Sequence, residues 1–201
     1  MEYLVTMTTQ VADGTSEETV ESVRSREAAR SRELAAQGYL LRLWRPPLQP
    51  GEWRTLGLFA ADDDTQLEEV LASMPLRVWR TDEATPLSPH PNDPQTNIRE
   101  TGSEFLTTFT IAVPTGTPAR TVDDTEAREA ERAHELAEQG HLLRLWTLPG
   151  SPRGSRTLGL WRAPELAELE KILESLPMYP WMTVETTPLA EHPNDPALTQ
   201  S

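Results

Sequence analysis

The sequence contains no cysteine and no apolar stretch long enough to cross a bilayer. The lack of cysteine excludes disulfides, thiol nucleophiles and thiolate metal sites. The N-terminal residues alternate in the manner of a strand, without a basic segment followed by an apolar core. We therefore expect a cytoplasmic protein with no signal peptide and no membrane partner.

Basic residues are also scarce, since 18 lysines and arginines stand against 32 aspartates and glutamates, for a formal net charge of -14. A field of this sign repels phosphate backbones, so we do not expect a nucleic-acid partner. The sequence has no glycine-rich phosphate loop, no nucleophile elbow and no histidine pair with metal-ligand spacing. We therefore expect a small-molecule substrate, no metal and no cofactor.

The sequence does contain an internal tandem repeat. At an offset of 102 positions, residues 26–44 match residues 128–146 at 14 of 19 positions without a gap, and the His-Pro-Asn-Asp-Pro of residues 90–94 recurs at 192–196. A repeat of this length predicts two domains rather than a solenoid. The expected divisions are repeat 1 over 1–94, a linker over 95–103, repeat 2 over 104–196 and a tail over 197–201.

Each repeat reads as strand, helix, strand, strand, helix, strand. In repeat 1 the expected strands are 3–10, 39–45, 53–60 and 78–85, with helices from Thr15 to Gly38 and over 62–74. This order predicts the α+β class with a ferredoxin-like sheet that carries helices on one face. We expect the bare sheet faces to pack on each other as an internal pseudo-dimeric α+β barrel. The sequence does not decide whether the chain also forms a homo-oligomer through this pseudo-dimer.

An acid lies on an otherwise apolar stripe of the first helix in each repeat. Glu27 shares the stripe of Val23 and Leu34, and Glu129 takes the same place in repeat 2. A carboxylate at the edge of a core has a raised pKa and suits proton transfer near neutral pH. The alternative is a surface ion pair with an arginine on the same helix. The arginines in question are Arg24 and Arg30 for Glu27, and Arg132 for Glu129.

Strict alternation in the second strand puts Leu41 and Leu43 toward the helices and Leu40, Arg42 and Trp44 on the opposite face. Arg144 and Trp146 repeat this arrangement. Such an arginine can hold a carboxylate or a developing enolate oxygen. The alternative is an arginine stacked on the tryptophan and paired with an acid across the pseudo-dimer interface. Further candidates for substrate binding are Tyr39, His141, Tyr179, Trp181, His90 and His192, although a turn explains the last two equally well.

Several segments resemble the muconolactone isomerase family over nearly all of each repeat. They are the Arg-Glu helix, the Leu-Trp that ends the second strand, Leu-Pro-Met-Tyr-Pro-Trp-Met at 176–182, and Thr-Pro-Leu with a nearby His-Pro at 85–91 and 187–193. The resemblance implies ferredoxin-like repeats paired into a barrel, no cofactor, and a proton shift along an unsaturated lactone. Glu27 and Glu129 match the acidic helix position to which we assign the proton carrier. The family's first-strand basic residue, second-strand histidine and third-strand asparagine are replaced here by Thr6 and Thr108, Arg42 and Arg144, and Thr55 and Thr157.

We therefore expect a cofactor-independent isomerase or cyclase that acts on an unsaturated lactone or carbonyl compound, in catabolism or in a specialised-metabolite pathway of the polyketide kind. A helix glutamate would carry the proton while an arginine stabilises the dienolate. A non-catalytic small-molecule binding protein and a cofactor-free oxygenase remain as alternatives. The two repeats differ at several positions near the expected cavities, so we expect one working site and favour the second. These positions include Tyr39 and His141, Trp53 and Ser155, Arg77 and Tyr179, and Arg80 and Met182.

Overall fold

The computed structural model describes residues 1–98, 102–150 and 155–200. Within these residues each repeat follows the predicted order, with a short 3-10 helix before its last strand. Repeat 1 holds β1 (Glu2–Thr9), α1 (Glu17–Ala36), β2 (Leu40–Arg45), β3 (Arg54–Ala60), α2 (Asp64–Ala72), η1 (Pro75–Trp79) and β4 (Arg80–Pro89). Repeat 2 holds β5 (Glu104–Ile111), α3 (Ala119–Glu138), β6 (Leu142–Thr147), β7 (Ser155–Arg162), α4 (Leu166–Glu174), η2 (Tyr179–Trp181) and β8 (Met182–Glu191), followed by η3 (Pro196–Gln200). The prediction of an α+β chain of two ferredoxin-like repeats is confirmed.

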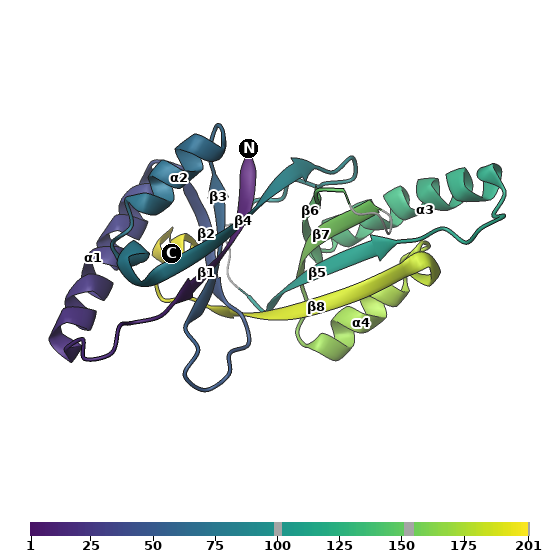
Figure 1. Cartoon of the computed structure of the whole chain (residues 1–201). Coiled ribbons are helices and arrows are strands. Elements are labelled where there is room, and N and C mark those ends of the chain that lie inside the picture. Colours follow the sequence, from purple (N-terminus) through teal and green to yellow (C-terminus); the bar gives the residue numbers. More distant parts are fainter. Residues whose placement is uncertain (99–101, 151–154, 201) are drawn as a thin grey trace. The chain divides into compact units, whose positions relative to one another are not determined.

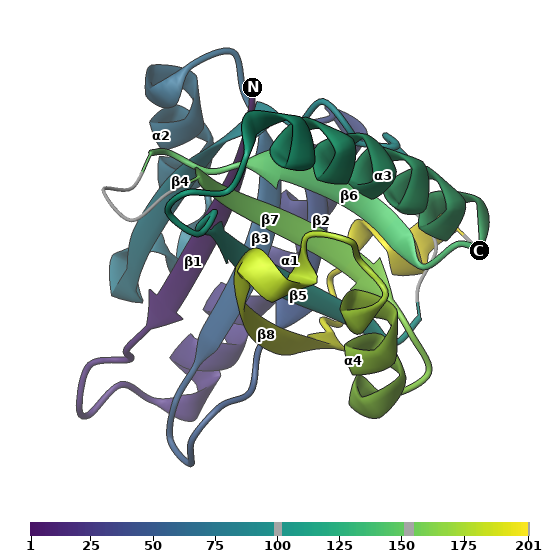
Figure 2. The same ribbon diagram turned by 90° about the vertical axis from the view of Figure 1, so that its right-hand side faces the viewer.

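The chain forms two compact units. Unit 1 contains Met1–Leu87 together with the chain from Ala190 onward, and unit 2 contains Ser88–Ile98 and Gly102–Leu189. The antiparallel sheet of unit 1 has the order β4-β1-β3-β2, with α1 and α2 on one face (Figure 1). The sheet of unit 2 has the order β8-β5-β7-β6, and Figure 2 shows α3 and α4 in front of it.

The last strand of each repeat ends in the unit built by the other repeat. The end of β8 pairs with β2 inside unit 1, and the end of β4 pairs with β6 inside unit 2. The pairs are Trp44 with Glu191, Arg45 with Ala190, Ser88 with Thr147, and Pro89 with Trp146. The two His-Pro-Asn-Asp-Pro segments that follow, called here the exchanged segments, are thus 192–196 in unit 1 and 90–94 in unit 2.

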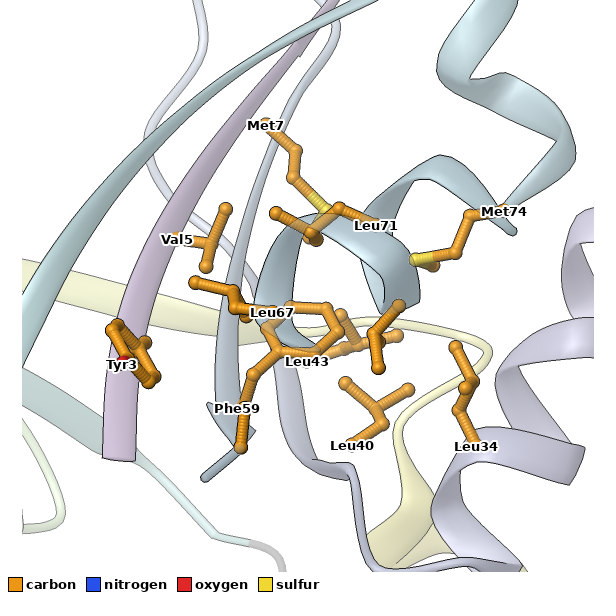
Figure 3. Close-up of a cluster of buried hydrophobic side chains, with 12 residues drawn as sticks. Tyr3, Val5, Met7, Leu34, Leu40, Leu43, Phe59, Leu67, Leu71 and Met74 are labelled. Carbon is orange, nitrogen blue, oxygen red and sulfur yellow. The ribbon is translucent and has the colours of Figure 1, made fainter. Parts of the chain in front are cut away.

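The core of unit 1 lies between its sheet and its two helices (Figure 3). Tyr3, Val5 and Met7 point into it from alternate positions of β1, as their spacing predicts. Leu34 of α1 and Leu67 of α2 close it from the helix side. Full burial of an aliphatic side chain contributes about 1.5–3 kcal/mol, so these residues hold the helices on the sheet. Unit 2 repeats the arrangement with Phe105, Phe109, Leu136 and Leu169.

The strict alternation predicted for the second strand is wrong. Leu40 and Leu43 both belong to the core on the helix side, because the register shifts between Leu40 and Arg42. Such a bulge adds one residue to the strand and changes the face of those beyond it. Leu41 is therefore displaced from the helix side, and Leu40 does not share a face with Arg42. The same shift occurs in β6 between Leu142 and Arg144.

The first helix begins one residue later than the capping-box spacing predicts. The backbone N–H of Thr19 donates to Oγ of Ser16 at 3.2 Å, which makes Ser16 the N-cap, while Thr15 closes the preceding turn. Gly38, with φ of 81°, follows the helix as predicted. No helix in the described part of the chain is long and apolar enough to span a membrane. Part of the predicted linker, residues 99–101, lies outside the described residues.

Candidate functional site

Two cavities lie at equivalent places in the two units. Cavity 1, of about 430 Å³, is lined by β1, α1, β2, the turn before β4, and exchanged segment 192–196. Cavity 2, of about 470 Å³, is lined by the matching elements of unit 2 and exchanged segment 90–94. Both volumes are in the range of small-molecule sites.

Glu27 of α1 is buried in the wall of cavity 1. The backbone N–H of Leu76 donates to its Oε2 at 2.8 Å, and Nη1 of Arg80 donates to its Oε1 at 3.1 Å. Arg80 is also paired with Asp82, with Nε and Oδ1 2.6 Å apart. Burial raises the pKa of Glu27, although the Leu76 N–H and Arg80 act in the opposite direction. In cavity 1 the carboxylate is therefore part of a closed ion-pair network.

Glu129 of α3 lies in the same place in cavity 2 without that network. The backbone N–H of Met178 donates to its Oε2 at 2.8 Å, and the position of Arg80 is taken by Met182, which also lines the cavity. Among the described residues, no basic side chain forms a salt bridge with Glu129. Burial raises the pKa of Glu129, and only the Met178 N–H opposes this effect. Of the two glutamates, Glu129 is thus the one whose raised pKa is not opposed by a cation.

The helix-surface ion pairs considered for these glutamates do not form. The guanidinium of Arg24 lies over the ring of Trp53, 4.5 Å from its centroid. Arg30 instead pairs with Glu33 at 2.8 Å, and Arg132 pairs with Glu135 at 2.7 Å. The apolar stripe therefore places Glu27 and Glu129 at the cavities, as the helical spacing predicts.

A histidine from an exchanged segment lines each cavity. Nδ1 of His90 accepts the N–H of Asn92 at 3.1 Å in unit 2, and Nδ1 of His192 accepts that of Asn194 at 3.2 Å in unit 1. Burial lowers the pKa of His90, and burial together with Arg45 lowers the pKa of His192 to about 4. Both rings are therefore neutral at pH 7, and the proton is on Nε2 because Nδ1 is an acceptor.

Arg42 and Arg144 line neither cavity. Nε of Arg42 donates to both carboxylate oxygens of Asp195 at 3.1 Å, and its guanidinium lies 4.9 Å from the ring centroid of Trp44. Arg144 makes the matching pair with Asp93 at 3.2 Å and stacks on Trp146 at 4.8 Å. This geometry favours the second interpretation of the sequence, an arginine stacked on tryptophan and paired with an acid, over a role in holding an enolate.

The other predicted binding residues also lie away from the cavity walls. Trp44 and Trp146 are buried beneath their arginines, and Nδ1 of His141 donates to the carbonyl of Arg162 at 3.1 Å. The remaining aromatic candidates Tyr39, Tyr179 and Trp181 do not line a cavity either, and the two tyrosines pack against the cores. Of the predicted residues, the structure thus brings together Glu27 with His192 and Glu129 with His90.

Several lining groups escaped the sequence analysis. The backbone N–H groups that bind the two glutamates carry no side-chain signal. The pairing of Glu27 with Arg80 could have been found only from the difference between Arg80 and Met182 at the repeat offset. Nothing in the sequence indicated that His192 completes the cavity of the first repeat.

Solved structures with a similar fold cover both repeats. A haem-binding protein from Thermus thermophilus is 12% identical, covers 94% of this chain and 92% of its own, and has a TM-score of 0.55. A variant of chlorite dismutase from Candidatus Nitrospira defluvii is 11% identical, covers 94% and 91%, and has a TM-score of 0.59. At such identities the likeness is one of fold, and it bears out the predicted α+β barrel class.

Relatives in sequence match one repeat at a time. Muconolactone Delta-isomerase of Cupriavidus pinatubonensis is 30% identical over 90 residues, which is 45% of this chain and 95% of the relative. The enzyme of the same name from Rhodococcus opacus is 28% identical over 91 residues, again 45% and 95%. The model of the family described as muconolactone delta-isomerase matches residues 1–93 and, a second time, 103–195. The chain therefore belongs to the muconolactone delta-isomerase family, as a member that carries the family's domain twice.

Proposed function

We propose that the chain is a cofactor-independent isomerase that moves a proton on an unsaturated lactone or a related carbonyl compound, and that cavity 2 is its working site. The membership of a family whose relatives are named muconolactone Delta-isomerases supports the reaction class. The observation that carries the choice of site is Glu129, which lines cavity 2, is fixed by the N–H of Met178, and is not neutralised by an arginine as Glu27 is.

In the proposed reaction the carboxylate of Glu129 takes a proton from the carbon α or γ to the carbonyl group. The electrons of that C–H bond pass into the conjugated system, and the intermediate is a dienolate with its charge on oxygen. Glu129 then returns the proton to the other end of the conjugated system, so the double bond moves and no atom is gained or lost. A positioned general base of this kind contributes about 10²–10⁴-fold to the rate.

His90 takes the role that the sequence analysis gave to an arginine. Because Arg144 is engaged by Asp93, we assign this role to Nε2–H of the neutral His90 ring, which lines cavity 2. A fixed neutral donor strengthens its hydrogen bond as negative charge develops on the substrate oxygen. Cyclisation and a role in a specialised-metabolite pathway stay predictions.

The test follows hydrogen exchange rather than one assumed product. Muconolactone, its methyl ester and simple β,γ-unsaturated lactones are incubated with the protein in D₂O, under nitrogen and with a chelator, and deuterium uptake at the α and γ carbons is read by NMR. We expect uptake with the native chain and with Glu27→Gln, and loss of uptake with Glu129→Gln. Thermal stabilisation by these compounds without exchange would indicate a binding protein, and consumption of oxygen in air would indicate an oxygenase. Either result would overturn the proposal.

A further inference from the structure

The two cavities differ in charge at three equivalent positions. Cavity 1 is lined by Arg24, Arg45 and Arg80. At the 102-residue offset the corresponding lining residues of cavity 2 are Glu126, Thr147 and Met182. Among the described residues that line cavity 2, none is a lysine or an arginine.

Two of the three arginines differ together with the residue that each contacts in unit 1. Arg80 and its partner Asp82 correspond to Met182 and Val184, both of which pack against the unit 2 core. Replacing both members of the Arg80–Asp82 pair leaves no unpaired charge at those two positions, and the carboxyl group that loses its cation is Glu129, the equivalent of Glu27. At these two positions cavity 2 is therefore apolar where cavity 1 is charged.

The second exchanged pair lies at the cavity mouth. Arg24, stacked on Trp53 in unit 1, corresponds to Glu126, and Trp53 corresponds to Ser155. A cation on an aromatic ring has been replaced by an acid beside a small polar residue. This exchange opens the rim and makes it repel anions.

The remaining ionisable groups of cavity 2 reinforce this selection. Glu126 and Glu129 are acids, and His90 is a neutral donor. Phe109, Trp161 and Met182 supply apolar surface around them. A carboxylate brought into this space would lose its water without gaining a cation, which is costly for a buried charge.

We propose, building on the function proposed above, that cavity 2 takes an uncharged, apolar unsaturated lactone or carbonyl compound and discriminates against substrates that carry a carboxylate. Muconolactone has such a carboxylate, so this member of the family has a changed substrate class. Cavity 1 keeps three arginines at the matching places and provides the internal control.

The test compares muconolactone with its methyl ester, two ligands of the same skeleton that differ in charge. Binding to the Glu129→Gln variant, which blocks turnover, is measured by calorimetry. We expect the ester to bind at least about tenfold more tightly than the acid, in line with the cost of burying an unpaired charge. Ala130→Trp, which fills cavity 2, should abolish this binding, and the matched variant Ala28→Trp, which fills cavity 1, should not.

A second variant moves a cation back into cavity 2. Thr147→Arg restores the residue found at position 45 of repeat 1 and should shift the preference toward the acid by about tenfold, whereas Thr147→Val should not. Tighter or equal binding of the acid, binding of neither ligand, or no response to Thr147→Arg would overturn the inference. Deuterium exchange by the native chain separates the two proposals. Ester-selective binding without exchange contradicts the isomerase alone, and exchange of the acid at or above the rate of the ester contradicts the substrate class alone.

Discussion

Cavity 1 and cavity 2 both have a glutamate at the same position of the first helix of the repeat, but the surroundings of this glutamate differ. In unit 1 Arg80 holds Glu27, and Asp82 holds Arg80 in turn. In unit 2 a hydrogen bond from the backbone N–H of Met178 fixes Glu129, and apolar side chains line the cavity around this carboxyl group. Identical strands and helices therefore do not imply identical chemistry, because the charge around one carboxyl group decides whether it can move a proton.

The largest expected effect concerns Arg42 and Arg144, the two arginines that pair with the exchanged segments outside the cavities. Arg42→Ala should lower the free energy of unfolding by about 3–5 kcal/mol, because it leaves the buried carboxylate of Asp195 without its cation. Arg144→Ala should cost less, since the Arg144 side chain is 14% exposed against 2% for Arg42. Urea denaturation of both variants measures the difference. Equal losses would show that exposure does not set the strength of these pairs.

The next largest effect separates the two glutamates. Glu129→Gln should reduce deuterium exchange by about 10²-fold or more, which corresponds to about 2.7 kcal/mol of barrier. Glu27→Gln should change it by less than about twofold, because Arg80 already neutralises Glu27. Since burial raises the pKa of Glu129, exchange should increase with pH as this group loses its proton. Two equal sites, each losing half of the activity with its own glutamate, would contradict the assignment of cavity 2.

A smaller effect is expected when cavity 1 is converted toward cavity 2. The double variant Arg80→Met with Asp82→Val removes this ion pair from both sides but leaves Glu27 without its cation, so it should lower the free energy of unfolding by less than the loss of about 3–5 kcal/mol expected for Arg80→Met alone. It should raise the pKa of Glu27 further. When it is combined with Glu129→Gln, deuterium exchange should be on the order of tenfold faster than with Glu129→Gln alone. The single variant Arg80→Met is the control, because it leaves Asp82 buried beside Arg77. The carboxyl resonance of Glu27, followed against pH, reports the pKa directly.

The smallest effect distinguishes the two histidines. The folded pKa of His192 is about 4, below the unfolded value of about 6.5, so its neutral form contributes stability that is fully present above the unfolded value. That contribution is lost as the pH falls from about 6.5 toward 4. His192→Gln should therefore flatten the acid side of the stability profile, by about 1 kcal/mol after allowing for partial exposure. His90→Gln should flatten it less. The reverse order would contradict the stronger burial effect at His192.

Periodicity predicted much of this molecule. The 3.6-residue spacing of α1 placed Glu27 beside Val23 and Leu34, and the offset of 102 placed Glu129 in the same position. These features depend on neighbours within a few turns of one helix, which a sequence displays directly. The bulge after Leu40 was not predicted because strand alternation contains no sign of an inserted residue.

Contacts distant in sequence were beyond prediction. Asp195 pairs with Arg42 across 153 positions, and His192 lines the cavity of the first repeat. Both depend on where β8 ends, which is set by the pairing of strands and not by local preference. An acid partner for Arg42 was among the interpretations of the sequence, but its identity required the structure.

The exchanged segments also affect how the chain can fold during translation. Arg42 of unit 1 is synthesised before unit 2, yet it waits for Asp195, which leaves the ribosome 153 residues later. At a translation rate of about 5–20 residues per second, this delay is roughly 8–30 s. Unit 2 has no such wait, because Asp93 is already made when Arg144 emerges. Unit 1 is therefore not completed before unit 2, although it contains the earlier part of the chain, and Arg42 spends this interval without Asp195.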